Sequence, residues 1–328
     1  MEIAFPPALS FTQKNTPMVI SKDFKNRFKD HTIWVKRDDL TGMELSGNKV
    51  RKLDYILKDA LIQGAKRIIT CGSLQSNHCR TSVYMARKLG LECTLYLRGK
   101  KPRVSTGNFF LNQLLEPEIH YVTVDEYQTI ETIMAERRKT SEINEENAYI
   151  IPEGGSNKIG VWGYINCFKE IEIQIKNSQL PIEVIVVATG SGGTHAGLLL
   201  GKILTKSNIE ILSVNVCDSA NFFKNKIIKI INDFKASFDY SFSLTLDDIK
   251  IYDGYAGAGY GKLKPEESRV IKRVAKSDGI LLDPVYTVKA YLGLEHLLSS
   301  GRIRYKNILF IHTGGIFGIF PYYDKFRL

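Results

Sequence analysis

Residues 183–204 read EVIVVATGSGGTHAGLLLGKIL, an apolar, β-branched run that leads through a glycine-rich turn into a segment with helical spacing. Such a stretch predicts a strand, a loop and a helix in succession. The backbone N–H groups of Gly190–Thr194 would then face outward at the start of the helix, where anions bind readily. The loop lacks the Gly-Lys-Ser/Thr end of a P-loop, and His195 takes the place of the third glycine in the dinucleotide fingerprint.

The same alternation of short apolar runs and helical spacing continues along the chain. The runs expected to form strands are TIWVK, RIITCG, CTLYLR, IHYVTV, AYIIP, EVIVVAT, IEILSVNV and NILFIHT. Helical periods are found at residues 49–63, 77–89, 125–138, 159–176 and 194–205, whereas 218–246 are helical at first and then unclear. The pattern predicts an α/β protein with two open, twisted, mostly parallel sheets flanked by helices, and ligands at the carboxyl ends of the strands.

The composition excludes several classes of protein. Of 328 residues, 44% are hydrophobic and 24% charged, as in ordinary globular proteins. No apolar run reaches the roughly 18 residues that span a membrane, and no secretory signal is visible, so we expect a cytoplasmic protein. Five cysteines without a CxxC pair and six scattered histidines argue against disulfides and a metal site. The net charge of +10 comes without aromatic residues in the basic run Arg98–Arg103, so we expect no nucleic-acid partner.

A second informative stretch, ELSGNKVRKL at residues 44–53, places Lys49, Arg51 and Lys52 at the start of a predicted helix. The helix dipole disfavours each cation there by roughly 0.3–1 kcal/mol. A phosphate-bearing cofactor would explain Lys52. The dipole and the two neighbouring cations would also lower the pKa of Lys49, which favours the neutral amine that attacks carbonyl groups.

Two further polar stretches follow predicted strands. In CGSLQSNHCRT, Ser76, Asn77 and His78 would cap a helix and offer donors to a carboxylate, although an ordinary helix cap explains them equally well. In AGAGYGKL and LLDPVYTVKA, Tyr260 and Tyr286 lie on loops bounded by Gly or Pro. Taken alone, such tyrosines indicate packing more often than chemistry.

Six segments together carry a family resemblance: VKRDDLTGMELSGNKVRKLDYILKDALIQGA, GSLQSNHCR, IPEGGSN, GSGGTHAGL, ILLDPVYT and FIHTGG. In order and spacing they resemble the D-cysteine desulfhydrase and 1-aminocyclopropane-1-carboxylate (ACC) deaminase family, which are pyridoxal 5'-phosphate (PLP) enzymes of the tryptophan synthase β fold. The resemblance implies a large PLP-binding domain of residues 1–48 and 164–328. It also implies a small α/β domain of residues 49–163, an active site in the cleft between them, a small amino-acid substrate and a homodimer.

The resemblance also implies roles for individual residues. Lys49 would form the Schiff base with PLP, Asn77 would hydrogen-bond its phenolic oxygen, and Thr313 would face its pyridine nitrogen. The phosphate would be held by Lys52 and by the loop residues Gly190, Ser191, Gly192, Gly193 and Thr194. The substrate would contact Ser76, Asn77, His78, Tyr260, Tyr286 and Thr287, and catalysis would involve Lys49, Ser76, Tyr260 and Tyr286. Val288 stands where many members have glycine and would add bulk beside the cofactor.

Two positions favour one reaction over the others. ACC deaminases resemble DPVYEGK and HLGG at places where this chain has Thr287 and Thr313. We therefore expect D-cysteine desulfhydrase activity, which yields pyruvate, hydrogen sulfide and ammonia. The runner-up is a β-eliminating lyase acting on β-chloro-D-alanine or L-cysteate, and ACC deaminase comes third.

Two other classes of protein stay open at this stage. A nicotinamide dehydrogenase would use the Gly190 loop and Asp218, but the missing third glycine counts against it. A non-catalytic protein that binds PLP or an amino acid would keep the fold without turnover. The presence of Lys49, Ser76 and both tyrosines argues against such a loss of activity.

Overall fold

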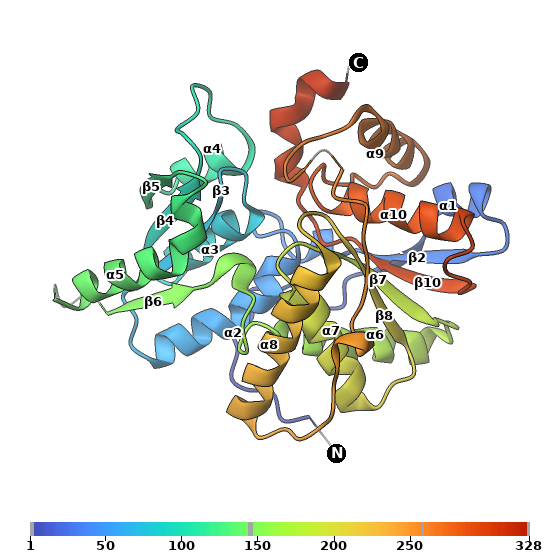
Figure 1. Ribbon diagram of the computed structural model, residues 1–328, viewed down its shortest axis with the longest axis horizontal. Coiled ribbons are helices and arrows are strands. Elements are labelled where there is room, and N and C mark those ends of the chain that lie inside the picture. Colours follow the sequence, from blue (N-terminus) through green and yellow to red (C-terminus); the bar gives the residue numbers. More distant parts are fainter. Residues whose placement is uncertain (1–2, 144–146, 258, 327–328) are drawn as a thin grey trace.

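The computed structural model describes residues 3–143, 147–257 and 259–326, which form two sheets side by side (Figure 1). The strand order is β1-β2-β10-β7-β8-β9 in the larger sheet and β5-β4-β3-β6 in the smaller one. Every strand pair is parallel in the described ranges except β1–β2. The strands are β1 (Met18–Ile20), β2 (Thr32–Lys36), β3 (Arg67–Ser73), β4 (Glu92–Arg98), β5 (Glu118–Val122), β6 (Ala148–Ile151), β7 (Val184–Thr189), β8 (Glu210–Asn215), β9 (Lys250–Tyr252) and β10 (Asn307–Ile311).

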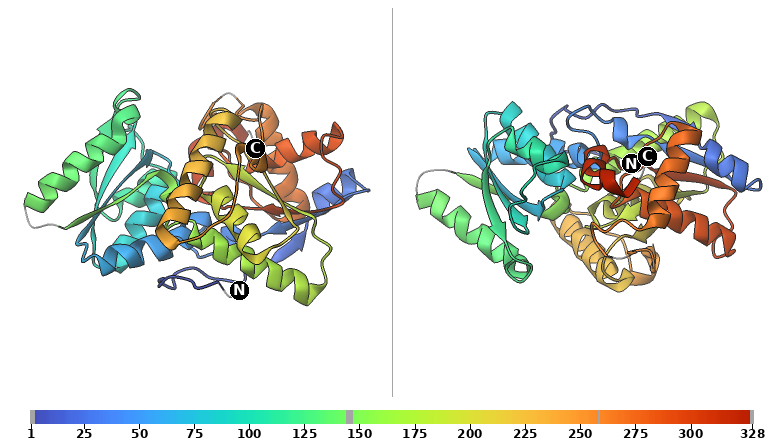
Figure 2. Two further views of the ribbon diagram at one scale, coloured as in Figure 1. Left: turned by 60° about the horizontal axis from the view of Figure 1, so that its bottom comes forward. Right: turned by 90° about the horizontal axis from the view of Figure 1, so that it is seen from above.

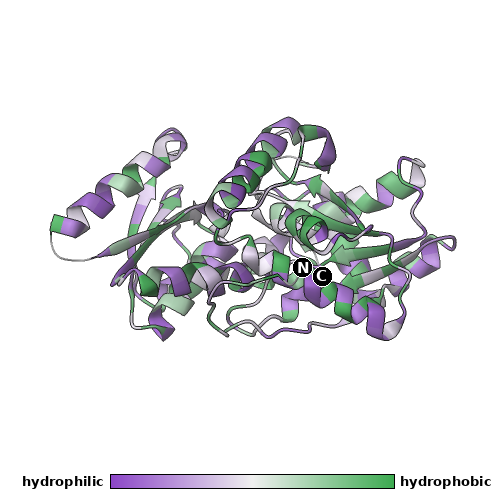
Figure 3. Cartoon of the chain, turned by 90° about the horizontal axis from the view of Figure 1, so that it is seen from below, coloured by the Kyte–Doolittle hydropathy of each residue, from purple (hydrophilic) through white to green (hydrophobic). Residues whose placement is uncertain are grey.

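Helices cover both faces of each sheet (Figure 2). In β7, Val184 and Val186 pack with α9 and α10, whereas Ile185 and Val187 pack with α6 and α7, which explains why this strand is apolar throughout. The outer helices instead alternate hydrophilic and hydrophobic residues (Figure 3). The helices are α1 (Lys22–Arg27), α2 (Asn48–Ile62), α3 (Asn77–Lys88), α4 (Gly107–Gln113), α5 (Ile130–Ile143), α6 (Trp162–Ser178), α7 (Gly193–Thr205), α8 (Ala220–Phe238), α9 (Pro265–Asp278) and α10 (Thr287–Ser299).

The predicted fold class is confirmed, and all eight expected strands are present. The stretch 218–246 is helical over Ala220–Phe238, which form α8, and its later part, where the pattern is unclear, is irregular up to η4 (Leu246–Asp248). The sequence analysis missed α9 and α10, although α9 begins with Pro265, Glu266 and Glu267, which are signals of a helix start. The larger sheet uses residues 18–36 and 184–311, and the smaller one residues 67–151. The domain limits expected from the resemblance stay a prediction.

The described helices show no candidate for a membrane span, because none combines sufficient length with sufficient apolarity.

A buried ion-pair network fastens the start of α2 to the larger sheet. Arg51 donates from Nη2 to Asp38 Oδ1 at 2.8 Å and from Nη1 to Glu170 Oε2 at 3.0 Å. Lys36 on β2 donates to the other oxygen of Glu170. Burial by itself raises the pKa of Asp38, but Arg51, Lys36 and the Tyr164 hydroxyl together outweigh burial and hold that pKa below its ordinary value. The helix that carries Lys49 is therefore tied electrostatically to β2 and α6.

We expect Arg51→Met to lower the free energy of unfolding by about 3–5 kcal/mol, because it leaves Asp38 buried without its cationic partner. Urea denaturation monitored by circular dichroism measures the change. Arg138→Met is the control, since Arg138 forms an exposed ion pair with Glu142 and its loss should cost less than about 1 kcal/mol. Equal stability of the two variants would show that the network does not anchor α2.

Candidate active site

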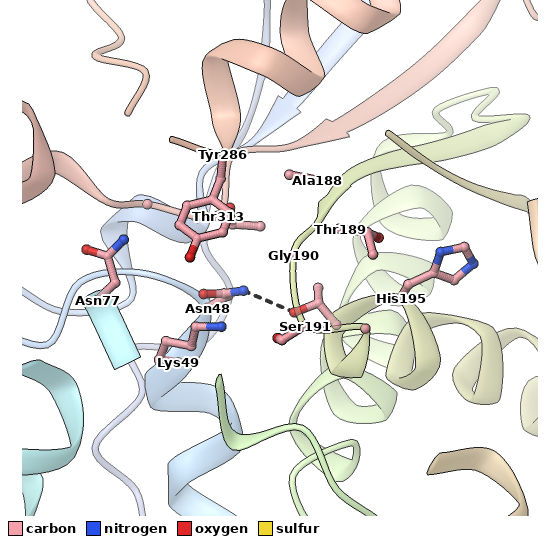
Figure 4. Close-up of a pocket in the computed structure, with 13 residues that line it drawn as sticks. Asn48, Lys49, Asn77, Ala188, Thr189, Gly190, Ser191, His195, Tyr286 and Thr313 are labelled. Carbon is pink, nitrogen blue, oxygen red and sulfur yellow. Dashed lines mark hydrogen bonds between the residues drawn. The ribbon is translucent and has the colours of Figure 1, made fainter. Parts of the chain in front are cut away.

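A cavity lies between the two sheets, where the carboxyl ends of their strands meet. It has two sides that share Lys49, Gly190, Ser191 and Tyr286. The first, here called the Thr313 side, is further lined by Asn48, Asn77, Ala188, Thr189, Gly192, Thr194, His195, Thr313 and Gly314. The second, here called the Ser76 side, is further lined by Ser73, Ser76, His78, Glu153, Gly154 and Tyr260. Lys49 and Tyr286 reach toward the same space from different elements (Figure 4).

The place of Lys49 follows from a close backbone contact between α2 and β10. Gly47 precedes α2 with a φ of 109°, and a Cβ on this residue would lie 2.8 Å from the carbonyl oxygen of Thr313. The Asn48 N–H donates to that same oxygen at 3.0 Å. Only glycine tolerates both the positive φ and this approach. The contact sets the first turn of α2 directly beside the end of β10.

Lys49 has a lowered pKa of about 8. Burial is the main cause of this lowering. The carboxylate of Glu153 raises the pKa of Lys49, whereas the ammonium of Lys226 on α8 lowers it further. The expected direction is thus confirmed. Neither Arg51 nor Lys52, the two expected neighbours, is among the main causes, and the Arg51 guanidinium is paired in the buried network. A pKa of about 8 leaves roughly a tenth of Lys49 as the uncharged amine at pH 7, far more than for an exposed lysine.

Lys52 lies beneath the glycine loop as a buried cation. Its Nζ donates to the Gly154 carbonyl and to Ser156 Oγ, both at 3.2 Å, and it has no acidic partner among the described residues. Burial, aided by Lys49 and Lys226, lowers its pKa well below the ordinary value. A buried cation without a counter-ion is costly, so this site is built to receive an anion.

The loop over Lys52 leaves no room for side chains at Gly190 and Gly193. A Cβ on Gly193 would lie 2.6 Å from Ser156 Oγ and 2.9 Å from Lys52 Nζ. A Cβ on Gly190 would lie 2.7 Å from the ring of Tyr286. The loop opens α7, whose first N–H groups have no partner within the helix. Together with Lys52 it fits the phosphate of PLP, and Thr194 lies beside it, where its hydroxyl accepts from Asn48 Nδ2 at 3.0 Å.

Asn77 is oriented by a neighbour that the sequence did not reveal. Asn108 of α4 is fully buried and donates from Nδ2 to Asn77 Oδ1 at 2.8 Å. With its oxygen occupied, Asn77 keeps its own NH₂ group to donate. An amide donor on the Thr313 side suits the phenolic oxygen of PLP, which is the role that the resemblance implies.

The start of α3 offers donors to a carboxylate, although the ring of His78 does not. The Thr70 hydroxyl donates to the Ile151 carbonyl and so accepts from His78 Nε2 at 2.8 Å, which leaves Nδ1 without a proton in the neutral ring. Burial, aided by Lys49 and Lys52, lowers the pKa of His78 well below its ordinary value, so the ring is neutral. The Ser76 hydroxyl and the free N–H groups of the first turn are the remaining donors.

Tyr260 and Tyr286 form a pair, with their hydroxyl oxygens 2.6 Å apart. The buried carboxylate of Asp283 accepts from the N–H of Tyr286 and thereby fixes the start of α10. Lys289 on the same helix donates to two carbonyls of the loop that precedes Tyr260, at 2.7 and 2.9 Å. Burial is the main reason why the pKa of Tyr260 is raised to about 12 and the pKa of Tyr286 is raised well above its ordinary value. Both hydroxyls therefore carry their protons at neutral pH.

The structure does not bring Thr287 or Val288 to the cavity. The fully buried hydroxyl of Thr287 accepts from the Asp283 N–H at 2.7 Å and donates to Asp283 Oδ1 at 2.8 Å, so its bonding capacity is used within the turn. Val288 belongs to the core beneath the larger sheet. The expectation that Val288 adds bulk beside the cofactor is wrong, and Thr287 contacts the turn that carries Tyr286 rather than the cavity.

Several lining residues were not anticipated from the sequence. Ser73, Glu153 and Gly154 line the Ser76 side, and Glu153 and Gly154 lie within IPEGGSN, the motif to which the sequence analysis gave no role. His195 lines the Thr313 side, where its Nδ1 lies 2.8 Å from Ser213 Oγ and burial lowers its pKa to about 3. The motif itself was the signal that would have located Glu153.

The lowered pKa of Lys49 predicts a reactive amine in cofactor-free protein. Acetylation of Lys49 by a pulse of acetic anhydride, followed by mass spectrometry, should reach half its maximal rate near pH 8, because the neutral amine is the nucleophile and accumulates above that pH. Exposed lysines in the same sample are the internal control. A rate for Lys49 that is still rising steeply above pH 10 would contradict the lowered pKa.

Comparison with known proteins identifies close relatives. A Thermotoga maritima protein named as a candidate ACC deaminase is 40% identical over 313 residues, which cover 95% of this chain and 97% of the relative. The Arabidopsis thaliana mitochondrial bifunctional D-cysteine desulfhydrase/ACC deaminase is 37% identical over 89% of this chain and 74% of its own length.

Solved structures agree. A crystal structure of an ACC deaminase homologue matches with a TM-score of 0.90 and 35% identity, and it covers 98% of this chain and 95% of the homologue. A threonine deaminase from Solanum lycopersicum shares the fold with a TM-score of 0.64 at 16% identity over 93% and 80% of the two chains. The family model for pyridoxal-phosphate-dependent enzymes matches residues 9–314. The chain therefore belongs to the pyridoxal-phosphate-dependent enzymes, in the group of the ACC deaminases and the bifunctional D-cysteine desulfhydrase.

Proposed function

We propose that this PLP-dependent lyase converts D-cysteine and water into pyruvate, hydrogen sulfide and ammonia. The observation that carries the proposal is the protonation of the groups around the cavity. The pKa of Lys49 is lowered to about 8, so part of it is the free amine near neutral pH, whereas the pKa of Tyr260 is raised to about 12, chiefly by burial. This combination suits removal of the α-proton of D-cysteine. It suits ACC less, because ACC has no α-proton and its ring must open by another route.

In this proposal the cavity residues have separate roles. PLP, when bound, supplies the electron sink that stabilises negative charge at Cα. The Ser76 hydroxyl and the first turn of α3 bind the substrate carboxylate, while Lys49 removes the α-proton. The protonated pair of Tyr260 and Tyr286 donates a proton to the departing sulfur. Lys52, the glycine loop and Asn77 hold the cofactor, and Thr313 faces its ring.

ACC deamination is the second candidate, because both relatives described above carry that activity in their names. A related β-elimination from β-chloro-D-alanine or L-cysteate is the third. A homodimer, expected from the family resemblance, and a cytoplasmic location, expected from the sequence, stay predictions.

Product analysis separates these candidates. Purified enzyme given D-cysteine should release pyruvate and sulfide in equal amounts, and L-cysteine should be inert. Lys49→Ala should lower the rate at least about 10³-fold, since the base and the attachment point of the cofactor are both removed. 2-Oxobutanoate from ACC, with D-cysteine inert, would overturn the proposal in favour of ACC deamination.

Position 313 should influence the reaction directly, since Thr313 lines the cavity and Thr287 does not. We expect Thr313→Leu to lower kcat for D-cysteine by about tenfold through loss of the hydroxyl at the cofactor ring. Thr313→Ser keeps the hydroxyl and is the matched control, with a change of less than about threefold. Equal kcat values for the two variants would remove this hydroxyl from the reaction. The kinetic constants for ACC, measured in parallel, show whether selectivity shifts at the same time.

A further inference from the structure

The carboxylate of Glu153 lines the Ser76 side of the cavity. Glu153 opens η3 (Glu153–Gly155) directly after β6, and it shares this side with Lys49, Tyr260 and Tyr286. Its Oε1 accepts a hydrogen bond from the Tyr127 hydroxyl at 2.8 Å. Among the described residues Glu153 forms no ion pair, so its charge is not cancelled by a direct partner.

Two contacts hold this carboxylate in place. Arg98 stacks between two tyrosines, with its guanidinium carbon 4.8 Å from the ring of Tyr127 and 5.5 Å from the ring of Tyr260. The Tyr127 hydroxyl is thereby kept on Glu153 from the side of the smaller sheet. On the other side, Gly154 has a φ of 70°, and a Cβ there would lie 2.5 Å from Ser191 Oγ. The backbone at Glu153 is consequently pressed against the glycine loop.

The charge of Glu153 acts on groups from several elements around the cavity. Burial lowers the pKa of Lys49 and the carboxylate opposes that shift. Burial raises the pKa of both Tyr260 and Tyr286, and the carboxylate adds to these shifts. These three groups come from α2, the segment that carries Tyr260 and the start of α10. A substrate side chain among them would lie near the same carboxylate.

We propose that Glu153 determines specificity by excluding amino acids whose side chain carries a full negative charge, and so restricts the enzyme to small substrates with an uncharged or weakly acidic side chain. The inference rests on the proposed function, because that function sets how the amino-acid substrate lies in the cavity. The α-carboxylate is met by the start of α3, whereas a second anionic group would face Glu153, which is only partly exposed to solvent. A like charge placed opposite a partly buried carboxylate reduces affinity by about tenfold or more. Under this assignment L-cysteate is a poor substrate and D-cysteine a good one.

The test compares two isosteric ligands that differ in charge, D-asparagine and D-aspartate, neither of which has a good β-leaving group. Their Kd values for the PLP-loaded enzyme are measured from the change in absorption of the bound cofactor. Wild-type enzyme should bind D-asparagine at least about tenfold more tightly than D-aspartate. Glu153→Gln, which keeps the acceptor for Tyr127, should reduce that preference to about threefold or less. Glu153→Asp keeps the charge and should keep the preference.

The control is Glu131→Gln, which removes an equal charge from an exposed position on α5 and should leave the preference unchanged. If Glu153→Gln does not retain the cofactor, Glu153→Ser allows the same comparison. An unchanged preference in the neutral variants, or no preference in wild-type enzyme, would overturn the assignment. Because the ligands are bound rather than turned over, this result is independent of whether D-cysteine yields pyruvate.

Discussion

Helix α2 belongs to both halves of the molecule, and the position of the active-site lysine follows from this double attachment. Its apolar face, with Val50 and Leu53, packs into the core of the smaller sheet. Its charged face is held by the larger sheet, through the Arg51 contacts with Asp38 and Glu170. A helix fixed from two sides presents its first turn at the junction, and Lys49 therefore lies between the sheets rather than on the surface of either one.

The cavity around that turn combines charges that are individually unfavourable. Lys52 is buried without an acidic partner, and Lys49 is driven toward its neutral form by burial. A bound phosphate would compensate the first cost and would make cofactor binding part of the electrostatic balance of the fold. Glu153 acts in the opposite sense on Lys49, because its carboxylate raises the pKa of that amine and favours the charged form.

The start of α10 shows how a site can be controlled by residues that do not touch it. Asp283 caps the turn through backbone N–H groups and through Thr287, and this turn holds Tyr286. Lys289, one turn further on, holds the loop of Tyr260. The tyrosine pair therefore depends on a single helix start. Replacing Thr287 with the glutamate found in ACC deaminases would place a second carboxylate beside Asp283, so the effect of position 287 passes through the geometry of the turn.

The alternating strands and helices, the glycine loop and the position of Lys49 at a helix start could be predicted from the sequence, because they follow from local periodicity and from the order of motifs. The family could be predicted as well, since six motifs in fixed order leave few alternatives. Three features became visible only in the folded chain: the pairing of Arg51 with Glu170, 119 residues away, the hydrogen bonds of Thr287 to Asp283 in the adjoining turn, and the position of Glu153 at the cavity. Whether a charge is exposed, paired or aimed at a substrate depends on contacts between distant segments, and no local pattern encodes those contacts.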